Sequence, residues 1–385
     1  MAVVIKPPPI WHRALPLVQG FDGPLLLAIA FLTGIGLLAM YSAAFEMPGR
    51  FDLHVRNLLV ATGVLFVAAQ ISPQRWLALA APMYLLGVAL LLAVDLVGIE
   101  RNGSQRWLDL GLLVIQPSEI MKLAMPLMLA WWFHKREGQL QGQDFLVAAV
   151  IVAVPTALIL SQPDLGTSLL IASSGLFVIY FAGLSWKLIV PPVLLGLAGM
   201  VALVWMEPHW CQPGVDWVLL HDYQKVRVCT LLNPTADPLG SGFHIIQSMI
   251  AIGSGGLWGQ GLLQGTQTQL DFVLERTTDF IFAAYAEEFG FLGVLLLLGG
   301  YLFLVWRGLK IAVEAPNLFT RLLAGALTLV HFVYAFVNIG MVSGILPVVG
   351  LPLPFLSFGG TAMVTLGASL GILLAIARSK RLRHS

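Results

Sequence analysis

Long apolar stretches recur along the chain, and they limit its fold more than any other feature. A membrane-spanning helix needs about 20 mainly apolar residues, whereas a membrane β-barrel shows short strands of alternating polarity. Charged residues make up 11% of the chain, against about 25% in soluble domains. The sequence therefore predicts an all-α polytopic integral membrane protein of about ten transmembrane helices. We place them near 23–43, 53–71, 76–97, 119–134, 144–160, 166–183, 186–206, 279–307, 319–344 and 359–379.

The distribution of Lys and Arg predicts how these helices are oriented. If the N-terminus lies inside, the inner segments hold most of the Lys and Arg residues although the outer segments are longer, as cytoplasmic loops do. Both termini are then cytoplasmic. The net charge of +1 gives no reason to expect a nucleic-acid partner. The chain divides into an N-terminal segment 1–22, helices one to seven over 23–206, a large outer loop 207–278, helices eight to ten over 279–379 and a basic tail 380–385.

The outer loop 207–278 is too long for a simple connection, and we expect it to be structured. A short amphipathic helix is expected over 243–252, before a glycine-rich stretch at 253–261. The two cysteines of the chain, Cys211 and Cys229, both lie in this loop. An oxidising outer compartment would allow a disulfide, and two separate thiols fit the sequence equally well.

A second irregular segment precedes the last helix. Residues 345–360 are apolar but contain Pro347, Pro352 and Pro354, which break helices. Non-helical apolar backbone persists at membrane depth only where protein surrounds it or where it lines a cavity. The sequence therefore predicts a re-entrant segment at this position.

Three carboxylates fall on the eighth predicted helix. Thr277 or Thr278 is expected to cap its start, which places Asp279 in the first turn, at the positive end of the helix dipole. Glu287 and Glu288 follow two to three turns deeper. An acid near the bilayer centre costs at least about 2.5 kcal/mol, so each carboxylate needs partners. We interpret Glu287 and Glu288 as structural and Asp279 as the candidate for chemistry.

Further charges gather near the same outer face. Ser118 is expected to cap the fourth helix, which makes Glu119 and Lys122 neighbours at i and i+3. The two form either an ion pair that fixes the helix or part of a site. Asp164 either caps the sixth helix or belongs to the site, and the sequence fits both roles equally well. Three arginines complete the group: Arg106, Arg227 and Arg276.

Together these residues describe a cavity that opens outward and mixes acids with bases. One fitting class is an enzyme acting on a lipid-linked substrate, in which cations hold a phosphate or pyrophosphate and a carboxylate is the general base. Alternatives are a transporter or lipid flippase with a charged pathway, and a non-catalytic scaffold. A transporter needs polar residues toward both faces. The inner half holds few besides Glu287, Glu288 and Asp95, which favours the enzyme.

Five segments, in order over most of the chain, carry a family resemblance. They are Gln116–Glu119 with Lys122, Pro163–Thr167, His244–Gly256, Thr278–Phe282 with Glu287 and Glu288, and Gly350–Gly360. Together they resemble the SEDS family (shape, elongation, division and sporulation), and within it the RodA type. Two stretches, Gly265–Phe272 and Val348–Phe355, look like the elongation branch rather than the division branch.

The resemblance implies a peptidoglycan glycosyltransferase that polymerises lipid II on the outer face of the bacterial inner membrane, during cell elongation and rod-shape maintenance. It implies that Asp279 is the catalytic residue and that Glu119, Lys122 and Asp164 line the central cavity. The usual partner in the family is a class B penicillin-binding protein, a transpeptidase, beside other membrane proteins of the elongation complex and the surrounding membrane lipid. The family usually has a histidine where this chain has Thr277, so one proton carrier is absent.

We therefore expect Asp279 to act as the general base for a sugar hydroxyl. The basic residues of the site would neutralise the departing pyrophosphate, with or without a divalent cation. No other cofactor is expected. The residues expected to bind substrate are Lys122, Glu119, Asp164, Arg106, Arg227, Arg276 and Ser357.

Overall fold

The computed structural model describes residues 20–101, 104–109, 111, 114–212, 215, 222–270 and 272–384. Within these residues the fold is almost entirely helical. Its ten long helices are α2 (Gly23–Ala43), α3 (Arg50–Gln70), α4 (Pro73–Val97), α5 (Pro117–Lys135), α6 (Gly142–Ser161), α7 (Leu165–Phe181), α8 (Trp186–Trp210), α12 (Ile281–Val313), α13 (Leu318–Val342) and α14 (Gly360–His384). Seven of them are long and apolar enough to cross a membrane. The predicted polytopic all-α fold is confirmed, and most helix ends lie within a few residues of the expected ones.

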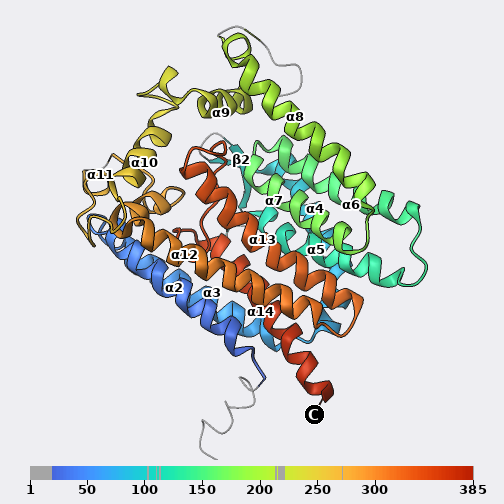
Figure 1. The fold of residues 1–385 in the computed structure, drawn as a ribbon. Helices are drawn as coiled ribbons and strands as arrows, with labels where there is room; N and C mark the ends of the chain where they lie inside the picture. The colour runs from blue at the N-terminus through green and yellow to red at the C-terminus, as the bar shows by residue number, and fades with distance from the viewer. Residues whose placement is uncertain are drawn as a thin grey trace, which may run out of the picture.

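The bundle is built around α13 and α14. In each of these two helices 72% of the apolar spanning window is buried inside the protein, against 22% to 39% in the other spanning helices. α14 packs along α3, and α13 packs against α12, α7 and α5 (Figure 1). The outer helices expose large apolar side chains such as Leu59, Leu85 and Phe291, as a lipid-facing surface requires.

The expected cap on α7 is present, whereas that on α5 is not. Asp164 accepts a hydrogen bond from the Thr167 N–H at 3.0 Å and caps α7. α5 begins at Pro117, because proline is favourable in the first helical position, and Gln116 is its N-cap residue. Ser118 lies inside the first turn, buried, and its hydroxyl makes no hydrogen bond with the described residues. The prediction that Ser118 caps this helix is therefore wrong.

The start of α12 also differs from the expectation. Neither Thr277 nor Thr278 caps the helix, and Phe280 is its N-cap residue. The Thr278 hydroxyl donates to the Glu275 carboxylate instead, so it does not reach the first N–H groups of the helix. Asp279 consequently lies just before α12 rather than in its first turn.

A small antiparallel sheet, which the sequence did not predict, follows α4. Its three strands, in the order β1-β2-β3, are β1 (Ile99–Arg101), β2 (Ser104–Asp109) and β3 (Val114–Ile115). The Gln105 amide donates to the Val94 and Gly98 carbonyls, 3.1 and 2.9 Å away, and fixes the sheet on the end of α4. The sheet thereby carries Arg106 to the junction of α6 and α7.

The large loop between α8 and α12 is mostly helical. Its elements are α9 (Asp222–Leu232), the 3₁₀ turn η1 (Pro234–Ala236), α10 (Phe243–Ser254) and α11 (Thr266–Gln269). The expected short helix over 243–252 is confirmed as α10, which packs against α12 (Figure 1). The glycine-rich stretch is hydrogen-bonded to α12: the Phe291 N–H donates to Gly256 and the Gly261 N–H donates to Glu288. These contacts lie at a kink in α12, where Gly290 has φ 63°.

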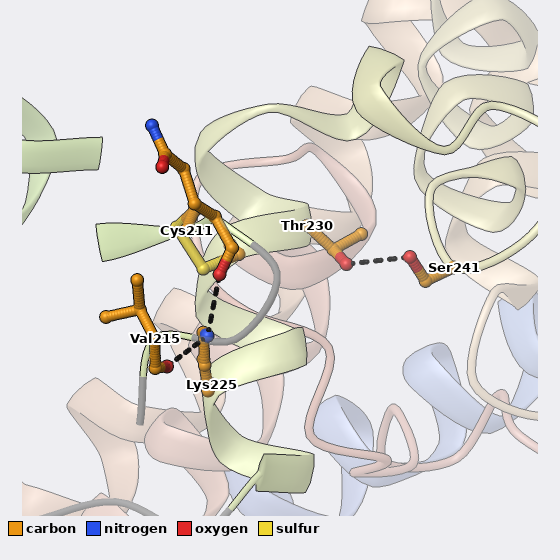
Figure 2. Close-up of a disulfide and its surroundings, with 7 residues drawn as sticks. Cys211, Val215, Lys225, Thr230 and Ser241 are labelled. Atoms are coloured by element: carbon orange, nitrogen blue, oxygen red, sulfur yellow. Dashed lines mark hydrogen bonds between the residues drawn. A yellow bond between two sulfur atoms is a disulfide. The ribbon is translucent and has the colours of Figure 1, made fainter. Parts of the chain in front are cut away.

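Cys211 and Cys229 form a disulfide, which decides between the two states that the sequence left open. The bond joins the C-terminal end of α8 to α9 (Figure 2). The Lys225 ammonium, one turn before Cys229, donates to the carbonyls of Gln212 and Val215 at 3.2 and 2.5 Å. A covalent bond and two hydrogen bonds therefore hold α9 against the chain that leaves α8.

Residues 345–359 connect α13 to α14 without forming a helix. Leu351 and Leu353 are buried. The Asn338 amide donates to the Leu351 carbonyl at 2.7 Å, and the Tyr301 hydroxyl donates to the Pro354 carbonyl at 2.6 Å. Neighbouring helices thus satisfy backbone groups that a helix would have satisfied internally, in agreement with the predicted re-entrant segment.

Candidate active site

A hydrogen bond holds the backbone of Asp279, whereas its carboxylate oxygens are not hydrogen-bonded to the described residues. The Asn338 amide of α13 donates to the Asp279 carbonyl at 2.8 Å. The Asp279 carboxylate makes no hydrogen bond with the residues that the structure describes. The backbone of Gly350 faces it, since a methyl group added there would lie 3.5 Å from Asp279 Oδ2. The position of this acid is therefore fixed without using its proton-accepting oxygens.

Ser357 supports the same backbone from the segment 345–359. Its buried hydroxyl donates to the Thr278 carbonyl at 2.6 Å and accepts from the Leu353 N–H at 2.7 Å. The Phe358 N–H donates to the Thr277 carbonyl at 2.7 Å. With both hydrogen-bonding directions of its hydroxyl used inside the protein, Ser357 is placed as a support of the site.

Burial and two neighbouring charges set the acidity of Asp279. Loss of hydration disfavours the ionised form of a carboxyl group. The pKa of the Asp279 carboxyl is raised from 3.8 to about 6, first by burial and then by the Glu275 carboxylate, while the Arg227 guanidinium on α9 acts in the opposite direction. A carboxyl group with a pKa near the working pH can accept a proton and release it again.

Glu119 and Lys122 form an ion pair near the start of α5. Lys122 Nζ donates to Glu119 Oε1 at 2.6 Å, and the Thr365 hydroxyl of α14 donates to Glu119 Oε2 at 2.8 Å. The Lys122 ammonium is buried, 5.4 Å from the ring centroid of Tyr334, and an aromatic face attracts a cation at that range. The pair is therefore enclosed by α5, α13 and α14.

Asp164 and Arg106 also come together. Arg106 Nη1 lies 3.5 Å from Asp164 Oδ2. Its Nη2 and Nε atoms donate to the carbonyls of Pro163 and Gln162 at 2.6 and 3.3 Å. The Arg106 side chain keeps 27% of its surface exposed, so this cation is anchored but accessible.

α13 connects these groups with Asp279. Tyr334 lies within electrostatic reach of Lys122 and Asp164. Asn338, which holds Asp279, stands four residues further along α13. Residues four apart share one face of a helix, about 6 Å from each other along its axis. One face of α13 therefore carries Tyr334, near Lys122 and Asp164, and Asn338, which binds the backbone of Asp279.

The two remaining arginines differ in their surroundings. Arg276 is buried, and its Nε and Nη2 atoms donate to the Ala43 carbonyl at 2.9 Å and to Glu46 at 3.3 Å. These bonds brace the loop against the end of α2. Arg227 is partly exposed on α9 and acts on the charge of Asp279.

Three residues of α3 were missed by the sequence reasoning: Arg50, His54 and Asn57. The Arg50 guanidinium lies 3.8 Å from the ring centroid of Phe358 and donates to the Thr277 hydroxyl at 3.2 Å. His54 is fully buried and stacks on the same ring. Their spacing of i, i+4 and i+7 gives one polar face on a mainly apolar helix. That pattern was the signal available in the sequence.

An open groove of about 540 Å³ adjoins the ion pair. It lies between α3, α4, α5 and α14. Glu119, Asn57 and Thr361 supply polar groups, and the walls are mainly apolar, with Val60 and Met83 among them. A volume of this size with a few polar groups is typical of small-molecule sites.

Glu287 and Glu288 bind the outer loop, which corrects their expected place in the inner half. Glu287 accepts bonds from the N–H and the hydroxyl of Thr268 at 3.0 and 2.7 Å. Glu288 accepts from the Leu263 N–H at 3.2 Å and from the Ser42 hydroxyl. The loop reaches both carboxylates because it folds back along α12. Their contacts agree with the structural interpretation.

Comparisons with known proteins extend over nearly the whole chain. The family model FTSW_RODA_SPOVE, described as cell cycle protein, matches residues 24–382. The peptidoglycan glycosyltransferase MrdB of Escherichia coli K12 is 47% identical over 355 residues, which cover 92% of this chain and 93% of MrdB. Stage V sporulation protein E of Bacillus subtilis is 36% identical over 369 residues, with 93% and 97% covered.

Solved structures show the same architecture. A chain of the structure described as "Structural coordination of polymerization and crosslinking by a peptidoglycan synthase complex" has a TM-score of 0.76 and 33% identity, and the match covers 94% of this chain and 99% of that one. The rod shape determining protein RodA of Thermus thermophilus has a TM-score of 0.69 and 28% identity, with 94% and 98% covered. This multi-pass membrane protein therefore belongs to the FtsW, RodA and SpoVE family of cell cycle proteins.

Proposed function

We propose that this protein is a peptidoglycan glycosyltransferase that polymerises lipid II, a sugar unit carried on polyprenyl pyrophosphate, during cell elongation and rod-shape maintenance. The observation that carries the proposal is the Asp279 carboxylate, which makes no hydrogen bond to the described residues while Asn338 holds its backbone. The Glu119–Lys122 ion pair, whose Glu119 borders the apolar groove, supports it. The name of MrdB, which is 47% identical, supports the same activity.

In this proposal Asp279 acts as the general base. A hydroxyl of the acceptor sugar gives its proton to the Asp279 carboxylate while the oxygen attacks C1 of the donor. A C–O bond forms at C1, the bond from C1 to the pyrophosphate oxygen breaks, and the pyrophosphate leaves with the electron pair. Because attack from the opposite face inverts C1, one carboxylate suffices and no covalent intermediate is needed.

The departing pyrophosphate needs positive charge around it. Lys122 is the buried cation and Arg106 an accessible one, and a fixed charge in an enclosed site acts more strongly than in water. Arg227 adds a third near Asp279. Among the described residues no group of three or more His, Cys, Asp or Glu side chains could hold a metal ion. A divalent cation bound mainly by the phosphates would need fewer protein ligands.

The groove beside Glu119 fits a lipid-linked substrate. Its walls are mainly apolar, and its polar groups include Glu119, Asn57 and Thr361. A prenyl chain would lie along the apolar walls while the pyrophosphate and sugars point to the polar groups. In this proposal the reacting end of the substrate lies on the side of the Glu119–Lys122 ion pair.

The proposed setting is the bacterial inner membrane. The C-terminus lies at the end of the bundle opposite α10 and α11 (Figure 1), which fits a cytoplasmic C-terminus and an outward-facing large loop. From the distribution of Lys and Arg we propose that the N-terminus is cytoplasmic as well. We propose a class B penicillin-binding protein as partner, together with other membrane proteins of the elongation complex. The match to a chain of a peptidoglycan synthase complex supports this partnership.

Transport of lipid II is less well supported by the geometry. A charged pathway through the inner half would have depended on Glu287, Glu288 and Asp95. The first two bind the outer loop. Asp95 accepts a bond from the Gln162 amide at 2.9 Å, at the junction of α6 and α7. The described residues therefore favour chemistry at one face over passage between two.

The test is polymerisation of labelled lipid II by purified protein, with and without a class B penicillin-binding partner, followed as glycan length on a gel. We expect polymer from the wild type and none from Asp279→Ala. Glu137→Gln, which changes an exposed acid at the other end of α5, is the matched control and should keep wild-type activity. No polymer from wild type with its partner bound would overturn the proposal in favour of a flippase or scaffold.

A further inference from the structure

Asp279 ends a short segment, residues 277–279, that is held from outside at three successive carbonyl groups. The donors are the Phe358 N–H at 2.7 Å, the Ser357 hydroxyl at 2.6 Å and the Asn338 amide at 2.8 Å, which bind the carbonyls of Thr277, Thr278 and Asp279 in that order. The segment precedes α12, so it is not fixed as part of that helix. The place of Asp279 therefore depends on contacts with the segment 345–359 and with α13.

Arg50 contacts both partners of one of these hydrogen bonds. Its Nη2 atom donates to the Thr277 hydroxyl at 3.2 Å, and its guanidinium lies 3.8 Å from the ring centroid of Phe358. The backbones of the same two residues are joined by the bond from the Phe358 N–H to the Thr277 carbonyl. We propose that Arg50 is a positioning residue of the active site, which holds residues 277–279 against the segment 345–359 and so fixes the place of Asp279. This inference rests on the proposed role of Asp279 as general base.

The helix α3 does not itself explain why an arginine stands at this position. Arg50 is the first residue of α3, where a cation opposes the helix dipole. Its side chain instead contacts two segments that come from distant parts of the chain. A planar guanidinium suits this double contact, because its face stacks on an aromatic ring while its edge donates hydrogen bonds.

His54 packs on the Phe358 ring from the next turn of α3. The His54 side chain is fully buried, and its ring stacks on that of Phe358 with the centroids 6.4 Å apart. Neither ring nitrogen of His54 makes a hydrogen bond with the described residues. α3 therefore contacts the Phe358 ring through two residues, and Arg50 links that ring to Thr277.

A small displacement of Asp279 should slow the reaction without weakening substrate binding. A general base needs its oxygen within hydrogen-bonding distance of the hydroxyl that loses the proton, and a misplacement of about 1 Å can cost about 10²-fold in rate. If Arg50 acts through the place of Asp279, its loss lowers kcat and leaves the KM for lipid II nearly unchanged. Direct binding of a substrate phosphate by Arg50 would instead raise KM.

The test measures kcat and KM of lipid II polymerisation for Arg50→Met, which removes both contacts and keeps a long side chain. We expect kcat to fall about tenfold and KM to stay within about twofold of wild type. Arg56→Met is the matched control, because Arg56 is an exposed arginine of the same helix, and it should keep wild-type kinetics. A wild-type kcat in Arg50→Met, or a raised KM with an unchanged kcat, would overturn the proposal.

The two contacts of Arg50 are then tested separately. Thr277→Val removes the hydroxyl and Phe358→Leu removes the aromatic face, and each should lower kcat about threefold. Thr277→Ser keeps the hydroxyl, and its kcat should stay within about twofold of wild type. In a protein that already carries Thr277→Val and Phe358→Leu, Arg50→Met should cause no further fall, because both contacts are gone. A further tenfold fall would show that Arg50 acts by another route.

If Arg50→Met does not accumulate, Arg50→Lys and Thr277→Val take its place. Lys keeps the cation and loses the planar group, so kcat should fall about threefold at an unchanged KM. Wild-type kinetics in both variants would overturn the proposal while leaving the proposed function intact. No polymer from wild type with its partner bound, or an active and well-folded Asp279→Asn variant, would instead refute the proposed function and this inference with it.

Discussion

The carboxylates at the start of α12 have the same charge and opposite surroundings. Asp279, just before the helix, makes no hydrogen bond through its carboxylate to the described residues, and only its backbone is held. Glu287, about two turns later, is fully buried and accepts bonds from the Gln267 and Thr268 N–H groups and from the Thr266 and Thr268 hydroxyls. The start of α12 is therefore flanked by an open acid, Asp279, whose carboxylate is not hydrogen-bonded to the described residues, and by a saturated acid, Glu287, both of whose oxygens accept hydrogen bonds.

This difference in hydrogen bonding suits Asp279 to act as a base and Glu287 to stabilise the fold. N–H and O–H donors stabilise the ionised form of a carboxylate and occupy the oxygens that would take up a proton. Burial without such donors has the opposite effect and raises the pKa of Asp279 to about 6. Replacing each acid by its amide keeps the shape of the side chain and removes the charge, so the same substitution tests both roles.

Asp279→Asn should give the largest effect, a fall in polymerisation rate of about 10²–10⁴-fold, because an amide cannot accept the proton. Stability should respond in the other direction. The folded-state pKa lies above the ordinary value of 3.8, so ionisation of Asp279 disfavours folding above about pH 4. The neutral amide avoids that cost, and Tm in detergent should stay the same or rise slightly. A well-folded variant that still polymerises would remove Asp279 as the base.

The pH dependence of the wild type is the second test of the open acid. The base must be ionised to work, and with a pKa of about 6 the rate should fall about tenfold for each pH unit below that value. Initial rates between pH 5 and pH 8 measure this limb. The residual rate of Asp279→Asn should lack it. A wild-type profile that stays flat down to pH 5 would contradict the raised pKa.

Glu287→Gln tests the saturated acid, and its effect should be on stability. The amide group of Gln turns a donor toward the Thr268 N–H, so two donors face each other in a buried site. The expected loss is about 2–3 kcal/mol of unfolding free energy, seen as a lower Tm. The rate per folded molecule should remain within about threefold of wild type. A variant with a normal Tm and no polymerisation would contradict the structural role and indicate that Glu287 takes part in the reaction.

Local patterns made much of the fold predictable. Apolar runs located the helices because each had to satisfy its backbone inside a membrane. The Glu119–Lys122 pair and the Asp164 cap also follow from neighbours three residues apart on one helix. Even the irregular segment 345–360 was visible, because prolines in an apolar run exclude a continuous helix.

Long-range contacts were beyond the sequence. The stack of Arg50 on Phe358 joins residues 308 positions apart, and the Ser42–Glu288 bond joins residues 246 positions apart; no local pattern specifies such partners. The cap at Thr278 failed for a local reason instead, since its hydroxyl is bound to the side chain of Glu275, three residues earlier. The lack of hydrogen bonds to the Asp279 carboxylate could not be predicted from the sequence either, because it depends on which donors the surrounding segments bring near it.

The smallest effect is expected at Ser42, whose hydroxyl donates to Glu288 Oε1. Ser42→Ala removes one donor and leaves the bond from the Leu263 N–H, so the expected loss is about 1 kcal/mol with no change in rate. Glu288→Gln should cost more, because the Leu263 N–H then faces an uncharged group. A double-mutant cycle of the two changes, read from Tm in detergent, should give a coupling energy of about 1 kcal/mol. If the losses of the two single variants simply add in the double variant, Ser42 does not stabilise Glu288. Glu287 would then be the remaining example of a structural acid in α12.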